Sequence, residues 1–177
     1  MNSKIISFAI EAHNKVNHLY DGKPYSVHLS MVAHYAVKYI DAIPQQCWGT
    51  VLNAAWLHDT IEDCRLTYND VKEVAGYEVA EIVYALTNDK GKNRKERAGE
   101  NYYKGIRETA WAKYVKLCDR LANVKYSVDT NSRMLEVYRK ENASFLTGLM
   151  SGSSDALIYK YPLEELDTLL YGVSKVA

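Results

Sequence analysis

The centre of this sequence is the string Leu57-His58-Asp59-Thr60-Ile61-Glu62-Asp63, which closes an apolar run that begins at Trp48. The spacing of apolar residues in that run is typical of a helix. If the helix continues, His58 and Glu62 lie on one face, one turn apart, and so do Asp59 and Asp63. A histidine and three carboxylates joined to an apolar helix are costly to bury without partners or a metal. The string therefore predicts a polar site at the end of a buried helix.

The bulk composition is that of a soluble globular protein. The chain has 177 residues, of which 47% are hydrophobic and 25% charged, enough for one domain with a sizeable core. Basic and acidic residues number 22 each, and this zero net charge argues against a broad nucleic-acid surface. We expect no signal peptide and no membrane span. Three cysteines without a CxxC pair favour a reducing, cytoplasmic location.

Helical periodicity runs through the rest of the chain, and no segment shows sustained strand alternation. We expect a loop over 17–24 with a turn at Asp21-Gly22. The expected helices cover residues 3–15, from Pro24 onward, from Pro44 to His58, 68–75, 78–86, 100–108, 109–124, 131–149, and from Pro162 onward. The sequence thus predicts an all-α fold of about eight to ten helices in one domain, 1–177, with 151–177 as a C-terminal helical extension.

Two residues outside the central string are out of place in their surroundings. A lone histidine is more often structural than a ligand, but His28 shares a helical face with apolar residues directly after an exposed turn. Asp119 interrupts an apolar helical run. The plainer explanation of Asp119 is a salt bridge with Lys116, three residues earlier. The alternative is that both residues join His58 and Asp59 in a metal site.

His28, His58, Asp59 and Asp119 make a set of two imidazoles and two carboxylates. Such a set suits Mn²⁺, Fe²⁺ or Zn²⁺ better than Ca²⁺, and the absence of thiolates argues against a structural zinc site. Four protein ligands on an octahedral ion would leave positions for water and a phosphate oxygen. The set therefore predicts metal-assisted hydrolysis of a phosphate compound.

Longer strings around these residues resemble a known family. Residues 22–28, 54–63 and 116–123 look like the hydrolase domain of the RelA/SpoT-type family of HD-domain metal phosphohydrolases. The resemblance covers about residues 5–150 in consistent order and spacing. The chain is similar in size to the small stand-alone alarmone hydrolases, including metazoan SpoT homologues.

The resemblance implies a single HD-domain helical bundle that removes the 3′-pyrophosphate from (p)ppGpp with the help of Mn²⁺. It implies that His28, His58, Asp59 and Asp119 hold the metal, and that Glu62 and Asp63 orient or deprotonate the attacking water. It also implies contacts to the nucleotide from Asn123, and to its pyrophosphate from the charged 89–97 segment. The candidates in that segment are Lys90, Arg94, Lys95 and Arg97. From composition alone, the same segment is equally well a solvated loop.

One stretch departs from the family pattern. The family usually has an Arg-Lys or Arg-Ser type pair just before the turn, on or near the guanine, whereas residues 13–22 hold no arginine. His18 or Tyr20 occupies that region, and either ring could stack on a base. Three alternatives therefore stay open: hydrolysis of another nucleotide, such as NADPH, a dNTP or an NMP; a non-catalytic nucleotide-binding regulatory module; and a metal-free structural helical protein. In the first two of these, as in the leading hypothesis, the partner is a small nucleotide, not a nucleic acid or a membrane.

Overall fold

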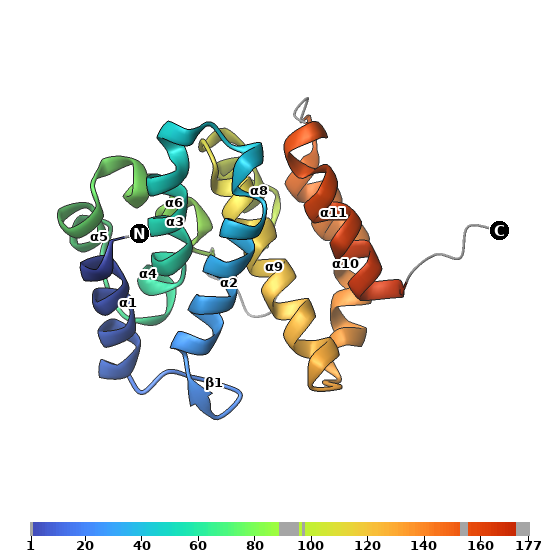
Figure 1. Ribbon diagram of the computed structural model, residues 1–177, viewed down its shortest axis with the longest axis horizontal. Coiled ribbons are helices and arrows are strands. Elements are labelled where there is room, and N and C mark those ends of the chain that lie inside the picture. Colours follow the sequence, from blue (N-terminus) through green and yellow to red (C-terminus); the bar gives the residue numbers. More distant parts are fainter. Residues whose placement is uncertain (1, 89–95, 97, 153–155, 173–177) are drawn as a thin grey trace.

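The computed structural model describes residues 2–88, 96, 98–152 and 156–172. This part of the chain is built from helices packed side by side, with a two-stranded hairpin at one end (Figure 1). The predicted all-α fold is confirmed. No helix in these residues is both long and apolar enough to cross a lipid bilayer.

The helices of the first half surround the segment that contains the central string. They are α1 (Ser3–Lys15), α2 (Ser26–Lys38), α3 (Trp48–Leu57), α4 (Thr60–Asp63), α5 (Tyr68–Ala75) and α6 (Tyr77–Leu86), with short 3₁₀ turns at Ile40–Ala42 and Gln45–Cys47. Helix α5 begins with a capping box, as the Thr67 and Asp70 pair in the sequence predicts: the Thr67 hydroxyl accepts from the Asp70 backbone, and the Asp70 carboxylate accepts from the Thr67 backbone.

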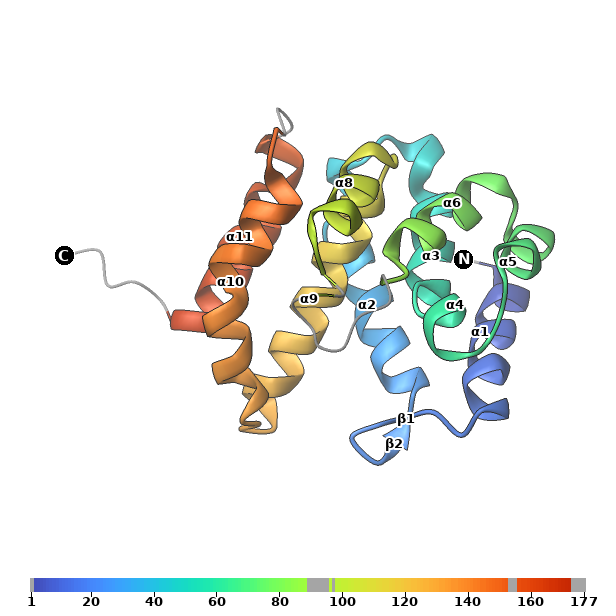
Figure 2. The ribbon, with the colours of Figure 1, turned by 180° about the vertical axis from the view of Figure 1, so that it is seen from behind.

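The second half consists of one short helix and three long ones. They are α8 (Glu100–Glu108), α9 (Ala112–Asp129), α10 (Met134–Met150) and α11 (Ala156–Tyr171). Helix α9 lies between two groups of helices: α2 packs on one side of it, and α10 and α11 on the other (Figures 1 and 2). Fully buried residues of α2, α3 and α9, such as Leu29, Leu57 and Leu121, form the core between them. The core therefore fixes the three segments that carry the candidate ligands.

The C-terminal extension packs on the rest of the chain. Leu166 and Leu170 of α11 are buried, on the face that meets α9 and α10. The Glu165 carboxylate bridges to α2, where it accepts hydrogen bonds from Lys38 at 2.6 Å and from the hydroxyl of Tyr39. One face of α11 is thus part of the core.

Helices α9 and α10 begin three residues later than predicted, and α6 one residue earlier. The three helix starts predicted at prolines are also wrong. Pro24 lies in a hairpin of β1 (Leu19–Tyr20) and β2 (Lys23–Pro24), whose turn at Asp21-Gly22 has φ of 51° and 75°. An Asp-Gly pair favours this two-residue turn, but strands of two residues are too short to show alternation in the sequence. Pro44 precedes a 3₁₀ turn, so α3 begins four residues later, at Trp48.

Pro162 lies inside α11 instead of opening it. The helix begins at Ala156, six residues before the proline. Proline in a helix interior removes one backbone hydrogen bond. Tyr159, in the turn before the proline, is only 2% exposed. We attribute the early start to this burial, because tertiary packing supplies most of the stability of a helix in a protein.

Candidate metal centre

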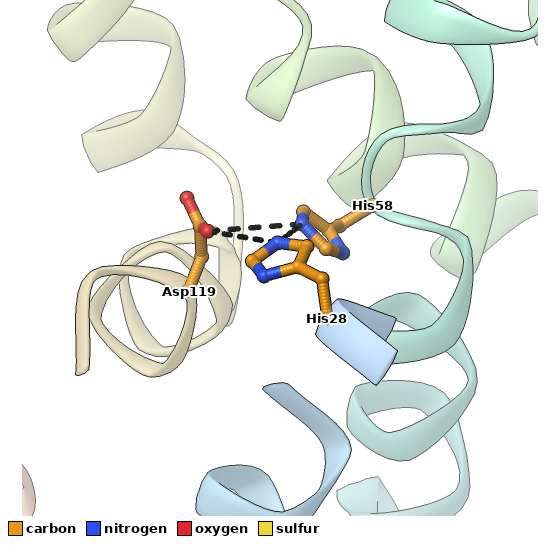
Figure 3. Close-up of side chains that lie close together, drawn as sticks. All are labelled: His28, His58 and Asp119. Atoms are coloured by element: carbon orange, nitrogen blue, oxygen red, sulfur yellow. Dashed lines mark hydrogen bonds and ion pairs between the residues drawn. The ribbon is translucent and has the colours of Figure 1, made fainter. Parts of the chain in front are cut away.

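Four side chains from three segments converge beside the core. His28 lies in the first turn of α2, His58 and Asp59 lie between α3 and α4, and Asp119 lies midway along α9. Figure 3 shows His28, His58 and Asp119 pointing toward one another. One ligand atom of each of these three lies within 4.8 Å of the others. His28 and His58 are 1% and 3% exposed, so the cluster is closed to bulk water on the side of the histidines.

The distances between the donor atoms run from 2.8 to 3.9 Å, close to those between ligands of one ion. Nε2 of His28 is 3.2 Å from Nε2 of His58 and 3.3 Å from Oδ1 of Asp119. Oδ2 of Asp59 is 2.8 Å from Nε2 of His58 and 3.5 Å from Nε2 of His28. Ligands about 2.1 Å from one ion, separated by angles of about 90° to 110°, lie about 3.0 to 3.4 Å apart. Two of the distances lie in this range, and the widest, 3.9 Å between Nε2 of His58 and Oδ1 of Asp119, exceeds it. His28, His58 and Asp119 lie close enough together to share a metal ion, with the Asp59 carboxylate beside the two histidines.

A break in the helix brings His58 and Asp59 to the same point. Adjacent residues of a regular helix project about 100° apart. The predicted helix end at His58 agrees with the structure to one residue, because α3 ends at Leu57. The helix does not continue regularly through the central string, since Asp59 has φ −100° and ψ 0° before α4 begins. The Thr60 hydroxyl donates to the Leu57 carbonyl at 2.7 Å and so satisfies one end of the break. Consequently both neighbouring side chains reach the cluster.

A backbone contact orients the imidazole of His58. Its Nδ1 is 3.0 Å from the carbonyl oxygen of Ala55. A carbonyl can only accept, so Nδ1 carries the proton and Nε2 of the neutral ring presents its lone pair to the cluster. Metal-binding histidines commonly make such a bond with their second nitrogen.

Asp119 is ionised by its surroundings. Burial alone would raise the pKa of its carboxyl, but the Lys116 ammonium and the nearby imidazoles of His28 and His58 lower that pKa well below the ordinary value of 3.8. Oδ2 accepts from Lys116 at 3.0 Å, and Oδ1 accepts from the amide of Asn123 at 2.6 Å. The predicted salt bridge with Lys116 is therefore present, and it leaves Oδ1 directed at the histidines.

The two acidic residues of α4, Glu62 and Asp63, lie in different environments. Oδ2 of Asp63 is 3.6 Å from Nδ1 of His18, and its side chain is 30% exposed. Burial, together with the charges of Asp59 and Glu62, raises the pKa of Asp63 to about 7. Glu62 is exposed and accepts hydrogen bonds from the backbone and side-chain amides of Asn88 at 3.0 to 3.2 Å. Glu62 thus reaches the chain just before the charged 89–97 segment.

The predicted nucleotide contacts lie at two places. The Tyr20 ring stacks on His28 with centroids 4.8 Å apart, and its hydroxyl donates to Oδ1 of Asn123 at 2.9 Å. His18 packs instead on Tyr25, on the side of Asp63. The other four candidates fall outside the described residues: Lys90, Arg94, Lys95 and Arg97.

Sequence reasoning overlooked two residues next to the cluster. The Tyr25 hydroxyl donates to Oδ2 of Asp59 at 2.5 Å, and His13 stacks on the Tyr25 ring. His13 is fully buried, and burial lowers its pKa to about 4. Tyr25 could have been noticed in the sequence, because it belongs to the 22–28 string that ends at His28. Nothing in the pattern of His13 distinguishes it from a core histidine.

Comparisons with known proteins place the chain among hydrolases of one kind. No protein-family model matches it. It is 33% identical over 121 residues to the zebrafish (Danio rerio) guanosine-3′,5′-bis(diphosphate) 3′-pyrophosphohydrolase MESH1, an alignment of 68% of this chain and 65% of that protein. It is 37% identical over 122 residues to the Aquifex aeolicus guanosine-3′,5′-bis(diphosphate) 3′-pyrophosphohydrolase, or 67% of this chain and 16% of the relative. Over about two thirds of its length, the chain is therefore similar in sequence to hydrolases of the RelA/SpoT type.

The alignments cover only part of each relative's length. The matched segment spans just under two thirds of the zebrafish relative and a small part of the bacterial one. A solved structure, described as a metazoan ortholog of SpoT that hydrolyses ppGpp, covers 98% of this chain with a TM-score of 0.68 and 21% identity. At that identity the likeness supports the fold of the family.

Proposed function

We propose that the chain is a metal-dependent hydrolase that removes the 3′-pyrophosphate from (p)ppGpp. The observation that carries the proposal is the convergence of donor atoms of His28, His58 and Asp119 within 4.8 Å of one another, with the Asp59 carboxylate beside the two histidines. Relatives named for this activity support the choice of substrate. The fold supports it as well, because a solved protein that hydrolyses ppGpp shares it.

The four donors would hold a single divalent ion. Two neutral imidazoles and two carboxylates favour Mn²⁺, with Fe²⁺ or Zn²⁺ as alternatives. Such an ion supplies a Lewis acid that activates water and polarises the phosphoryl group. Nδ1 of His58, bonded to Ala55, keeps Nε2 free for this role, and Lys116 keeps Asp119 ionised.

Asp63 is our candidate for the proton acceptor. Attack of water on the phosphorus attached to the ribose 3′ oxygen breaks that P–O bond, and gives GDP and pyrophosphate from ppGpp. The water proton would move to the carboxylate of Asp63, whose pKa of about 7 suits a general base at neutral pH. Glu62 would act from beside it, by holding Asn88.

The nucleotide would lie across α9 and the hairpin. Asn123 and Tyr20 border the cluster on that side and are the candidates for contacts with the ribose and the base. His18 borders it beside Asp63. A pyrophosphate group needs cations, and Lys116 is already paired with Asp119. By the family resemblance, the proposed phosphate contacts are Lys90, Arg94, Lys95 and Arg97.

A second candidate is hydrolysis of a different nucleotide that carries a ribose phosphate, such as NADPH. The observation that favours it is the position of Tyr20, which covers His28 and uses the side-chain oxygen of Asn123. No arginine in residues 13–22 offers a guanidinium plane in its place.

A product assay distinguishes these candidates. The protein with Mn²⁺ would be incubated separately with ppGpp, NADPH and a dNTP panel, and the products resolved by anion exchange. Release of GDP and pyrophosphate from ppGpp, abolished in Asp63→Asn, is the expected result. Cleavage of another nucleotide with ppGpp intact would transfer the proposal to the second candidate. Binding of nucleotide without any cleavage would indicate a regulatory module.

A further inference from the structure

Tyr25 is bonded to a proposed metal ligand. It directly precedes α2, three residues before His28, and is 8% exposed. Its hydroxyl donates to Oδ2 of Asp59 at 2.5 Å. The same oxygen lies 2.8 Å from Nε2 of His58. The bond therefore ends on the atom of Asp59 that faces the cluster.

The orientation of the Asp59 side chain is not fixed by a capping bond to the backbone. Asp59 lies at the break between α3 and α4, and its carboxylate makes no capping bond to α4. Its two imidazole neighbours, His28 and His58, are themselves proposed ligands. Among the described contacts of this carboxylate, Tyr25 is the neutral donor that comes from outside the metal set. The hydroxyl can therefore orient the carboxylate whether or not a metal is bound.

Two histidines hold the tyrosine ring. The rings of His13 and His18 lie 4.3 Å and 4.0 Å from the Tyr25 ring, tilted from it by only 15° and 19°. Their Nδ1 atoms are 3.1 Å apart, within hydrogen-bond distance of each other. The three-ring cluster of His13, His18 and Tyr25 joins α1, the segment before the hairpin, and the start of α2. It restrains the ring that carries the hydroxyl.

We propose that Tyr25 is a positioning residue, which holds Asp59 in the orientation that binds the metal, and that His13 and His18 hold Tyr25 in turn. This inference rests on the proposed metal centre. Partners that orient metal ligands typically change metal affinity about 10- to 100-fold when removed. The substitution Tyr25→Phe keeps the stacked ring and removes only the hydroxyl. It therefore isolates the effect of the hydrogen bond to Asp59 on metal affinity.

The test is calorimetric titration of the metal-free protein with Mn²⁺. Tyr25→Phe should bind Mn²⁺ about 10- to 100-fold more weakly than the wild type. The matched control is Tyr68→Phe, which removes a hydroxyl bonded to Glu81 at 2.6 Å on α5 and α6. The control should bind like the wild type. Equal affinity in Tyr25→Phe and the wild type would overturn the role of Tyr25 alone, whereas a wild type that binds no Mn²⁺ would overturn the metal centre as well.

Two substitutions of His18 test the three-ring cluster. His18→Ala removes one of the rings that restrain Tyr25, and should weaken Mn²⁺ binding. His18→Phe retains a flat ring against Tyr25 and should restore most of that affinity. An affinity of His18→Phe as low as that of His18→Ala would contradict the proposed restraint by stacking.

Discussion

Lys116 and Asp119 lie one turn apart on α9, with the ammonium nitrogen 3.0 Å from Oδ2 of the carboxylate. The other oxygen, Oδ1, is 3.3 Å from Nε2 of His28. A salt bridge and a place in the metal cluster are therefore compatible for Asp119, although the sequence presents them as alternatives. Each oxygen has its own partner, and the lysine side chain is only 19% exposed.

Lys116→Met should destabilise the protein strongly when no metal is present. Removal of one partner from a buried ion pair costs about 3 to 5 kcal/mol when the other charge is left without compensation. The loss here should be at the lower end of this range, because His28, whose pKa is raised to about 9, still faces the Asp119 carboxylate at 3.3 Å. Urea unfolding in EDTA would measure this loss. With Mn²⁺ the loss should be smaller, since the ion offers the Asp119 carboxylate a new positive partner.

Lys125→Met is the matched control on the same helix. Lys125 pairs with Asp129, but both side chains are about half exposed. Exposed pairs contribute less than about 1 kcal/mol. Equal losses of stability in the two variants would contradict the assignment of Lys116 to a buried pair.

Asp63→Asn should lower turnover about 10²- to 10⁴-fold without weakening Mn²⁺ binding, because it removes a proton acceptor and no metal ligand. The wild-type kcat/KM should also fall as the pH drops below about 7, where Asp63 becomes protonated and can no longer accept a proton. Asp167→Asn, exposed on α11, serves as the control. Full turnover in Asp63→Asn would remove this residue from the mechanism.

Glu62→Ala should retain the metal and lose turnover. Its carboxylate holds Asn88 and belongs to no pair within the metal cluster. If Glu62 acts through that bond, Asn88→Ala should lower turnover by a similar factor. Kinetic assays of both variants, with Mn²⁺ affinity measured alongside, would decide the point. A loss of metal in Glu62→Ala would show that it is a ligand.

Glu165 should make stability depend on pH in the acid range. Burial opposes its ionisation, but hydrogen bonds from Lys38 and Tyr39 lower its pKa below the ordinary value of 4.5. Its stabilising effect is therefore complete above about pH 4.5 and is lost as the pH falls through the lower pKa of the folded state. In urea unfolding, Glu165→Gln should be less stable than the wild type at pH 7, and this difference should shrink below pH 4.5. The exposed neighbour Glu164→Gln is the control, and a difference that stays constant with pH would contradict the assignment.

The fold was largely predictable because most helices carry their own signals. Apolar periodicity and the Thr67 capping box predicted the extents of α1, α5 and α8 closely. The errors lie where tertiary contacts decide. Burial of Tyr159 lets α11 begin before Pro162, and the two-residue strands around Asp21-Gly22 are too short to give a pattern.

The candidate metal ligands were predictable from the sequence, but the contacts that orient these ligands were not. The candidate ligands followed from residue type and from the family resemblance. The break at Asp59, which lets two adjacent side chains meet, is a matter of backbone geometry that spacing does not reveal. Tyr25 and Asp59 are 34 positions apart, so no local pattern predicts their bond. The roles of Lys90, Arg94, Lys95 and Arg97 stay predictions.

The proposed hydrolysis depends most on one metal ion held by four side chains, and anomalous diffraction tests the presence of this ion directly. Crystals soaked in Mn²⁺ would be measured at the manganese absorption edge. One strong anomalous peak is expected about 2.0 to 2.3 Å from Nε2 of His28, Nε2 of His58, Oδ1 of Asp119 and the Asp59 carboxylate. No peak there, or a peak that these four side chains do not contact, would contradict this proposal.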